Sequence, residues 1–187
     1  MQHGETMTVR SILIAPDPRL KVRSKPVLAV DGEVRRLMDD MLETMKSADG
    51  IGLAAPQIGV LRRVIVVAAP RGDADDDGEG RSKVPLCMAN PEVVWASDEE
   101  EVREEGCLSL PEHYAEVCRP ARVRVRYLDE TNAVREIEAD GLLGTCIQHE
   151  IDHLEGVLFV DHISTLKRSM ILRKLTKSKR LNGAAVG

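Results

Sequence analysis

The sequence predicts an α+β fold: mainly antiparallel sheets packed around a central helix, with one helix near the N-terminus and another near the C-terminus. Three observations predict it. Residues 31–50 have helical apolar spacing, residues 121–127 alternate as a strand does, and two helical stretches close the chain. With 187 residues, the chain is long enough for a sizeable core. We expect a single domain over 1–187, of which residues 162–187 form a basic C-terminal helix and tail.

The first helix is predicted over residues 31–50. Asp31 can cap its start and Gly50 can end it. The apolar residues recur at the i, i+3 and i+4 spacing of one helical face: Val34, Leu37, Met38, Met41, Leu42 and Met45.

The stretch after this helix holds less regular signals. Residues 50–59, GIGLAAPQIG, contain too much glycine and proline for regular structure, and residues 64–69 form a candidate strand. Residues 71–83, RGDADDDGEGRSK, are expected to form an exposed acidic loop. A calcium site is the alternative, but its ligand pattern is poor.

The second half begins with extended structure. Residues 93–102 are predicted to be extended, and in residues 121–127 apolar positions alternate with Arg122, Arg124 and Arg126. Residues 129–132 form a turn and residues 133–139 return as a partner strand. Residues 142–155 and 163–181 then form the second and third helices.

The second helix contains the sequence His149-Glu150-Ile151-Asp152-His153. Histidines at i and i+4 lie on one helical face, where both imidazoles can bind one metal, and Glu150 can handle a water molecule. The pattern alone is only moderately specific, and an ordinary surface helix or hydrogen-bonded core histidines are the alternatives. Apolar residues flank the histidines on more than one side of the helix, which predicts burial, and buried histidines need partners.

A catalytic metal site needs a third protein ligand and an open position. No acidic residue follows Asp161, so the glutamate of thermolysin-like enzymes is missing, and Phe159 occupies the third-histidine position of the metzincin pattern. The remaining candidate type is cysteine. Cys107 lies in EGCLSLP, between a glycine and a proline that shape the backbone. Cys146 is the rival, although three ligands on one helical face would leave the metal poorly enclosed.

Three segments resemble the signature motifs of the peptide deformylase family. They are GIGLAAPQ at 50–57, EGCLS at 105–109 and QHEIDH at 148–153, in the family's order and at similar spacings. The resemblance extends from about residue 12 to 174 and is closest to the type I bacterial enzymes, which have an extended C-terminal helix. Residues 1–6 and 71–82 look like additions that interrupt no motif.

The resemblance implies a metal-dependent hydrolase that removes the formyl group from the N-terminal formyl-methionine of nascent polypeptides and releases formate. Cys107, His149 and His153 would bind the metal, with water in the fourth position. Glu150 would transfer the proton from this water to the departing amine. The side-chain amide of Gln57 and the backbone N–H of Leu108 would stabilise the oxyanion.

The resemblance also implies a substrate site. Gly52 would let an extended peptide approach closely. An apolar pocket for the methionine side chain would have Ile51, Leu108 and Cys146 in its walls and Tyr114 at its rim. Ordinary core packing is the alternative for these residues, above all for Cys146.

Glu105 and Arg119 are expected to pair behind the cysteine segment and to support the metal ligands, as corresponding residues do in relatives. The alternative is a plain ion pair on the surface, which the spacing of these two residues along the chain does not exclude.

The identity of the metal does not follow from its ligands. One thiolate and two imidazoles suit Zn²⁺, Ni²⁺, Co²⁺ or Fe²⁺. The resemblance favours one Fe²⁺ per chain in the cell, with the other metals expected in purified protein.

Two further functions stay open at this point. A metallopeptidase would share the HExxH pattern, but it needs the downstream ligand that this chain lacks. A structural zinc protein would need a fourth ligand, for which Cys118 and Cys146 are the candidates.

The charge distribution suggests a partner for the C-terminal helix. Residues 162–187 hold seven basic residues and no acidic one, whereas residues 1–161, with 19 basic and 31 acidic residues, have a net charge of −12. Resemblance to bacterial relatives suggests docking on the ribosome near the exit tunnel. Met170, Ile171 and Leu175 would face the body. The cations offered to phosphate would be Lys167, Arg168, Lys174, Lys177 and Arg180.

The alternative for this helix is a merely solvated surface. No apolar run long enough for a bilayer and no secretory signal pattern are present. We therefore expect a cytoplasmic protein with no membrane and no DNA partner.

Overall fold

The computed structural model describes residues 8–70 and 84–184. Its helices are α1 (Gly32–Ser47), α2 (Gly141–Leu154) and α3 (Thr165–Ala184), with short 3-10 helices η1 (Pro18–Lys21), η2 (Ala55–Ile58) and η3 (Phe159–His162). The strands are β1 (Gly52–Ala54), β2 (Val64–Val67), β3 (Leu86–Ala96), β4 (Glu100–Cys107), β5 (Leu110–Pro120), β6 (Arg122–Leu128) and β7 (Val134–Asp140).

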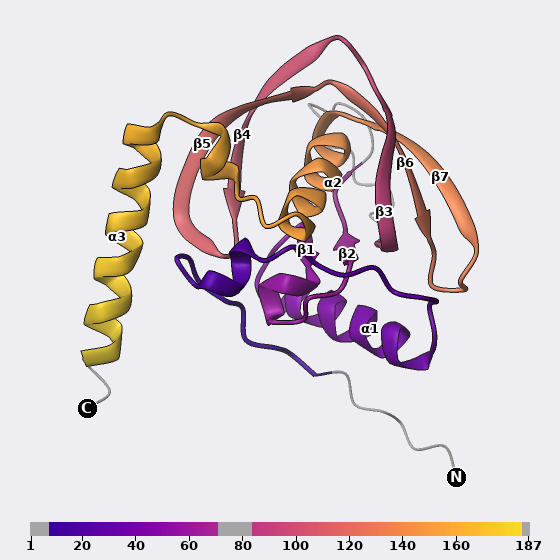
Figure 1. Ribbon diagram of the computed structural model, residues 1–187, viewed down its shortest axis with the longest axis horizontal. Helices are drawn as coiled ribbons and strands as arrows, with labels where there is room; N and C mark the ends of the chain where they lie inside the picture. Colours follow the sequence, from indigo (N-terminus) through magenta and orange to yellow (C-terminus); the bar gives the residue numbers. More distant parts are fainter. Residues whose placement is uncertain (1–7, 71–83, 185–187) are drawn as a thin grey trace.

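These strands form two antiparallel sheets. The larger has the order β1-β2-β3-β6-β7, and β4 and β5 pair separately as a two-stranded sheet. Figure 1 shows α2 between this pair and the upper part of the larger sheet, with α1 below β1 and β2. The predicted α+β class, the antiparallel pairing and the three helices are therefore confirmed.

The strand β2 is buried on both faces, because helices cover it on both sides. Ile65 and Val67 belong to the core cluster that includes Leu143 and Ile147 of α2. Val64 and Val66 belong to a different cluster, in which α1 contributes its apolar residues Val34, Leu37, Met38, Met41 and Met45. This two-sided burial explains why residues 64–67 form an unbroken apolar run rather than an alternating one.

Residues 50–59 are more regular than the sequence predicts. Gly52 to Ala54 pair with β2, and residues 55–58 make a turn of 3-10 helix. Pro56 is tolerated because it lies in the first turn of this helix, where its missing N–H is not needed. Gly59 ends the turn in the left-handed region, at φ 80°.

The prediction of one extended segment over residues 93–102 was wrong in its boundaries. Residues 97–99 separate β3 from β4, and the long strand β5 was not predicted at all. Most residues of β4 are charged, and the apolar residues of β5 are irregularly spaced, so neither strand shows the apolar alternation that reveals β6. The predicted acidic loop at 71–83 lies outside the described residues.

The long α3 contacts the body through a minority of its residues. Leu175 is buried, and Ile171 and Leu172 pack beside it against the third core cluster. Met170 was expected on this face, but it is 51% exposed, because the contacting stripe is narrower than predicted. In the described part of the chain, no helix combines the length and the apolar character that crossing a membrane requires.

Candidate metal centre

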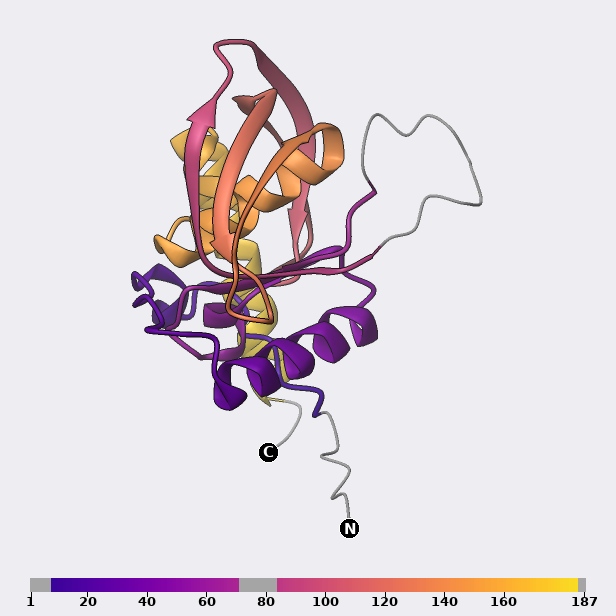
Figure 2. The ribbon, with the colours of Figure 1, turned by 90° about the vertical axis from the view of Figure 1, so that its right-hand side faces the viewer.

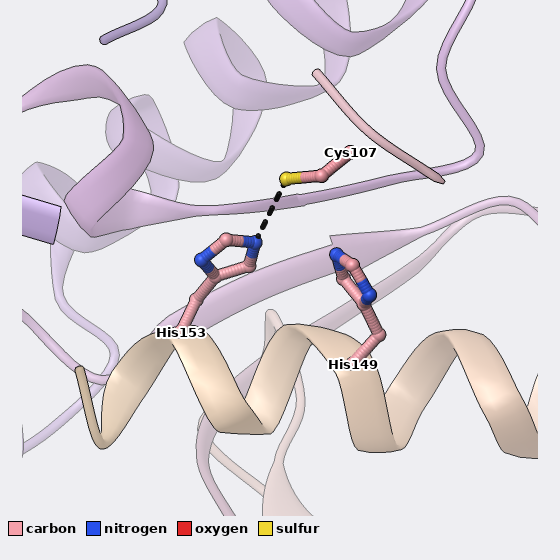
Figure 3. A group of neighbouring side chains, drawn as sticks. All are labelled: Cys107, His149 and His153. Atoms are coloured by element: carbon pink, nitrogen blue, oxygen red, sulfur yellow. Dashed lines mark hydrogen bonds between the residues drawn. The ribbon is translucent and has the colours of Figure 1, made fainter. Parts of the chain in front are cut away.

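One cysteine and two histidines converge beside α2. Their ligand atoms all lie within 4.8 Å of one another, and Sγ of Cys107 lies 3.3 Å from Nε2 of His153. The two histidine rings point to the same side of the helix, toward the cysteine at the end of β4 (Figure 3). Among the histidine, cysteine, aspartate and glutamate side chains of residues 8–70 and 84–184, these three form the one group close enough to share a metal ion.

Local backbone structure explains why the cysteine reaches the helix. Cys107 and Leu110 are paired across a tight connection, and the register shifts between Gly106 and Cys107. A side chain at Gly106 would come within 2.6 Å of the Tyr114 ring, so the glycine lets this tyrosine lie across the hairpin. The cysteine therefore sits at an irregular corner of a strand, as the sequence suggested.

A buried ion-pair network holds His149. Its Nδ1 donates to Oε2 of Glu105 at 2.9 Å, and the Nε and Nη2 groups of Arg119 donate to both oxygens of the same carboxylate. Glu105 and Arg119 are only 5% and 7% exposed, so they do not form a surface ion pair. Burial opposes ionisation of Glu105, but the hydrogen bonds from His149 and Arg119 lower its pKa to about 2.

This contact leaves the other ring nitrogen of His149, Nε2, to face Cys107, and carboxylates orient metal-binding histidines in the same way. His153 is 1% exposed, and its Nδ1 is buried without a hydrogen-bond partner. Burial lowers the pKa of His153 well below its usual value, so the ring is held neutral. Neutral imidazole is the form that ligates metals.

Glu150 borders the same space. It is 4% exposed, its Oε2 has no hydrogen-bond partner, and burial raises its pKa to about 7. A side chain at Gly52 would collide with its Oε1 and come within 2.9 Å of its Cδ. The Glu150 carboxylate can therefore occupy this position only because residue 52 has no side chain.

The side chain of Gln57 is fixed at both ends. Its Oε1 accepts from the backbone N–H of Ala54 at 2.8 Å, and its Nε2 donates to Oγ of Ser109 at 3.1 Å and lies 3.5 Å from Sγ of Cys107. The amide therefore presents its N–H groups toward the cysteine. Ser109 is fully buried. Sequence reasoning missed its role, although it is the last residue of the EGCLS segment.

A cavity of about 440 Å³ opens beside these groups, a size suited to a small ligand or side chain. Its lining includes Cys107, His149, Gln57 and Glu150, together with the residues expected around a substrate: Ile51, Gly52, Leu108, Tyr114 and Cys146. Ile51 and Tyr114 are 40% and 64% exposed, so they stand at the mouth. Arg119 and His153 do not line the cavity.

The other cysteines do not join the three ligand candidates. Sγ of Cys146 donates to the carbonyl of Ile51 at 3.5 Å, and burial raises the pKa of this thiol well above its usual value. Cys118 is exposed and donates to Glu100 instead. In the described part of the chain, neither cysteine completes a closed four-ligand site of the structural kind.

Comparison with known proteins gives a consistent result. The profile of the family described as polypeptide deformylase matches residues 9–169. A peptide deformylase of Methylocella silvestris is 58% identical over 176 residues, which cover 94% of this chain and 88% of that protein.

Solved structures agree with the sequence matches. The crystal structure of peptide deformylase from Ehrlichia chaffeensis has a TM-score of 0.85 and 40% identity, and the match covers 94% of this chain and 99% of that one. The same enzyme in complex with actinonin has a TM-score of 0.83, again with 40% identity, covering 93% of this chain and 99% of that one.

Proposed function

The chain belongs to the peptide deformylase family, and from this premise we propose that it removes the formyl group of N-formyl-methionyl peptides at the cavity beside Cys107, His149 and His153. The activity is that of the family, a metal-dependent hydrolysis that releases formate. The assignment of residues rests chiefly on one observation: a sulfur and two imidazole nitrogens lie within 4.8 Å of one another beside a cavity.

The three side chains fit a transition metal. A thiolate and two imidazoles form a soft ligand set, which suits Fe²⁺, Zn²⁺, Ni²⁺ or Co²⁺ and not Mg²⁺ or Ca²⁺. We propose Fe²⁺ as the metal in the cell. Such a metal supplies Lewis-acid chemistry, because it makes water nucleophilic at neutral pH and polarises the formyl carbonyl.

Glu150 is the proposed proton carrier. Its carboxylate lines the cavity next to a ligand residue, and its Oε2 has no protein partner that would compete for a proton. It takes a proton from the attacking water and delivers it to the amine of methionine as the C–N bond breaks.

Two N–H donors stabilise the negative charge that develops on the formyl oxygen. One is Nε2 of Gln57, which is held in place by Ala54 and Ser109. The other is the backbone N–H of Leu108, which follows the ligand cysteine. Such donors typically contribute a factor of about 10² to 10³ each to the rate.

The substrate enters as an extended peptide along β1. Gly52 leaves space beside Glu150, and the methionine side chain occupies the part of the cavity bounded by Ile51, Leu108 and Cys146, with Tyr114 at the rim. An acetyl group is larger than a formyl group and would crowd the metal beside Gly52. Formyl is therefore preferred to acetyl.

We also propose that α3 places the enzyme near its substrate. Lys167, Lys174, Lys177 and Arg180 lie on exposed parts of this helix, whereas Arg168 pairs with Asp161 and is partly engaged. The exposed cations would bind ribosomal RNA close to the exit tunnel in the cytoplasm, where formylated chains emerge.

The decisive experiment measures formate release from formyl-Met and acetyl-Met tripeptides by anaerobically prepared protein. We expect rapid release from the formyl peptide and at least a hundredfold slower turnover of the acetyl peptide. Glu150→Gln keeps the shape of the side chain but cannot carry the proton, so it should retain metal and lose most turnover. New peptide termini without formate, or equal rates on both substrates, would overturn the proposal.

A further inference from the structure

The short helix η3 contacts the candidate metal centre, and none of its residues lines the cavity. Phe159, at its start, is 1% exposed and stacks on His149, with ring centroids 6.3 Å apart and an interplanar angle of 25°. In this offset arrangement, the aromatic ring lies beside one face of the imidazole and limits its rotation.

The last residue of η3 reaches the same imidazole by a polar route. Nε2 of His162 donates to Oδ2 of Asp152 at 2.8 Å, and Nη1 of Arg119 donates to the same oxygen at 2.9 Å. Arg119 in turn clasps Glu105, which accepts from Nδ1 of His149. The chain runs from a half-exposed histidine to a buried ligand candidate, with donors and acceptors alternating at every step.

Asp152 is the adjustable link in this chain. Its side chain is 24% exposed, so without a second partner it could turn toward solvent and release Nη1 of Arg119. The bond from His162 holds the carboxylate against Arg119.

The position of η3 is itself secured. Asp161 accepts the N–H of Leu158 and pairs with Lys21 and Arg168, which lie in other elements. Because these ion pairs connect η3 to η1 and to α3, its position is fixed relative to both elements.

We propose that η3 supports the metal centre from outside by two routes. Phe159 packs against the ring of His149. His162 acts on Nδ1 of His149 through the hydrogen-bonded chain of Asp152, Arg119 and Glu105. Both are positioning residues. This inference rests on the proposed role of His149 as a metal ligand. Direct partners of ligands typically change metal affinity about 10- to 100-fold. For His162, which acts at a greater distance, we expect a change of about 3- to 10-fold.

The test compares His162→Ala, His162→Gln and Phe159→Leu in the metal-loaded full chain. The rate of Zn²⁺ loss to excess chelator and the visible spectrum of the Co²⁺ form both report on ligand geometry. His162→Ala should lose metal about 3- to 10-fold faster, with a changed Co²⁺ spectrum. His162→Gln can still donate to Asp152 and should restore both. Phe159→Leu keeps apolar bulk without the flat ring and should also speed metal loss.

Asp129→Asn is the matched control, because it breaks a polar cluster in the β6–β7 turn without touching this chain. It should lower thermal stability and leave metal loss and spectrum unchanged. The effect of His162→Ala should also disappear in the Asp152→Ala background, since both changes break the same path.

Unchanged metal loss and spectrum in His162→Ala and Phe159→Leu would overturn the inference, as would equal effects of His162→Ala with and without Asp152. Neither result would touch the proposed function, which fails separately if the unaltered chain binds no metal or releases no formate.

Discussion

Cys107 differs from the other proposed ligands because it would reach the metal from a separate sheet. His149 and His153 would remain together on α2 without it. We expect Cys107→Ala to fold normally, since the cysteine is a small partly buried residue, but to retain little metal. Metal content per chain and circular dichroism measure the two properties.

Cys118→Ala is the matched control for this prediction. Cys118 lies on the same two-stranded sheet, is exposed and hydrogen-bonds Glu100, so its loss should leave metal content unchanged. If Cys107→Ala still held one tightly bound metal per chain, the third ligand would have to be sought at Cys146.

Gly52 carries the second prediction at this scale. A methyl group there would lie 2.7 Å from Sγ of Cys146 and 2.9 Å from Cδ of Glu150, closer than real Cβ contacts. Glu150 must therefore move, and a displacement of about 1 Å at a catalytic group can cost about 10² in rate. We expect Gly52→Ala to keep its metal and lose about a hundredfold in kcat.

Gly32→Ala provides the comparison. A methyl group at Gly32 meets nothing closer than 3.6 Å, so turnover should stay at the level of the unaltered chain. A Gly52→Ala enzyme with unaltered kcat would show that Glu150 does not need its present position.

The residues that sequence reasoning found are those whose spacing has a local meaning. His149 and His153 are one helical turn apart, so their shared face follows from the sequence alone. Ser109 and His162 were missed, because their contacts with Gln57 and Asp152 depend on tertiary packing that no local period encodes.

At the scale of elements, a helix or strand could be predicted from the sequence where its apolar residues recur at regular spacing. The helix α1 and the pair β6–β7 were predicted because one face of each is buried and the other exposed. The pair β4–β5 was not predicted as a pair, because most residues of β4 are charged and the apolar residues of β5 have no regular spacing. The proposed cysteine ligand, Cys107, nevertheless lies at the end of β4, and only its motif pointed to it.

The turn between β6 and β7 supports a prediction about pH. The carboxylate of Asp129 accepts from the hydroxyl and N–H of Thr131, from Arg135 and from the N–H of Ala133. These contacts, led by the Thr131 hydroxyl, hold the pKa of Asp129 far below its usual value. A lowered carboxyl pKa stabilises the folded state above the unfolded pKa of about 3.9, and this stabilisation declines as pH falls below it.

We therefore expect Asp129→Asn to lower the thermal midpoint at pH 7, because the amide can neither accept at both atoms nor attract Arg135. The difference from the unaltered chain should shrink as pH falls from about 4 toward 2. Thermal unfolding at several pH values measures this. A difference that stays constant over the range would show that shape, not charge, makes the turn stable.

At the scale of the whole molecule, charge is segregated between body and tail. Leu175, Ile171 and Leu172 anchor the helix α3 to the body, so the residues after Leu175 can be removed without disturbing the core. We expect deletion of residues 176–187 to weaken cosedimentation with ribosomes at low salt, because Lys177, Lys179 and Arg180 are lost.

Turnover of short formyl peptides should stay unchanged in the same deletion, since the cavity lies far from these residues in sequence and shares none of them. Cosedimentation equal to that of the full chain would remove the tail from the docking proposal and leave the deformylase assignment intact.

The site draws on residues that are widely spaced along the chain. Gly52 and Gln57 come early, Cys107 lies in a sheet of its own, and His153 precedes only the last helical part. During its own synthesis, the chain therefore lacks part of the proposed metal site until α2 has left the ribosome. If it acts on unfinished chains, as we propose, the enzyme is itself inactive for most of the time that it is still an unfinished chain.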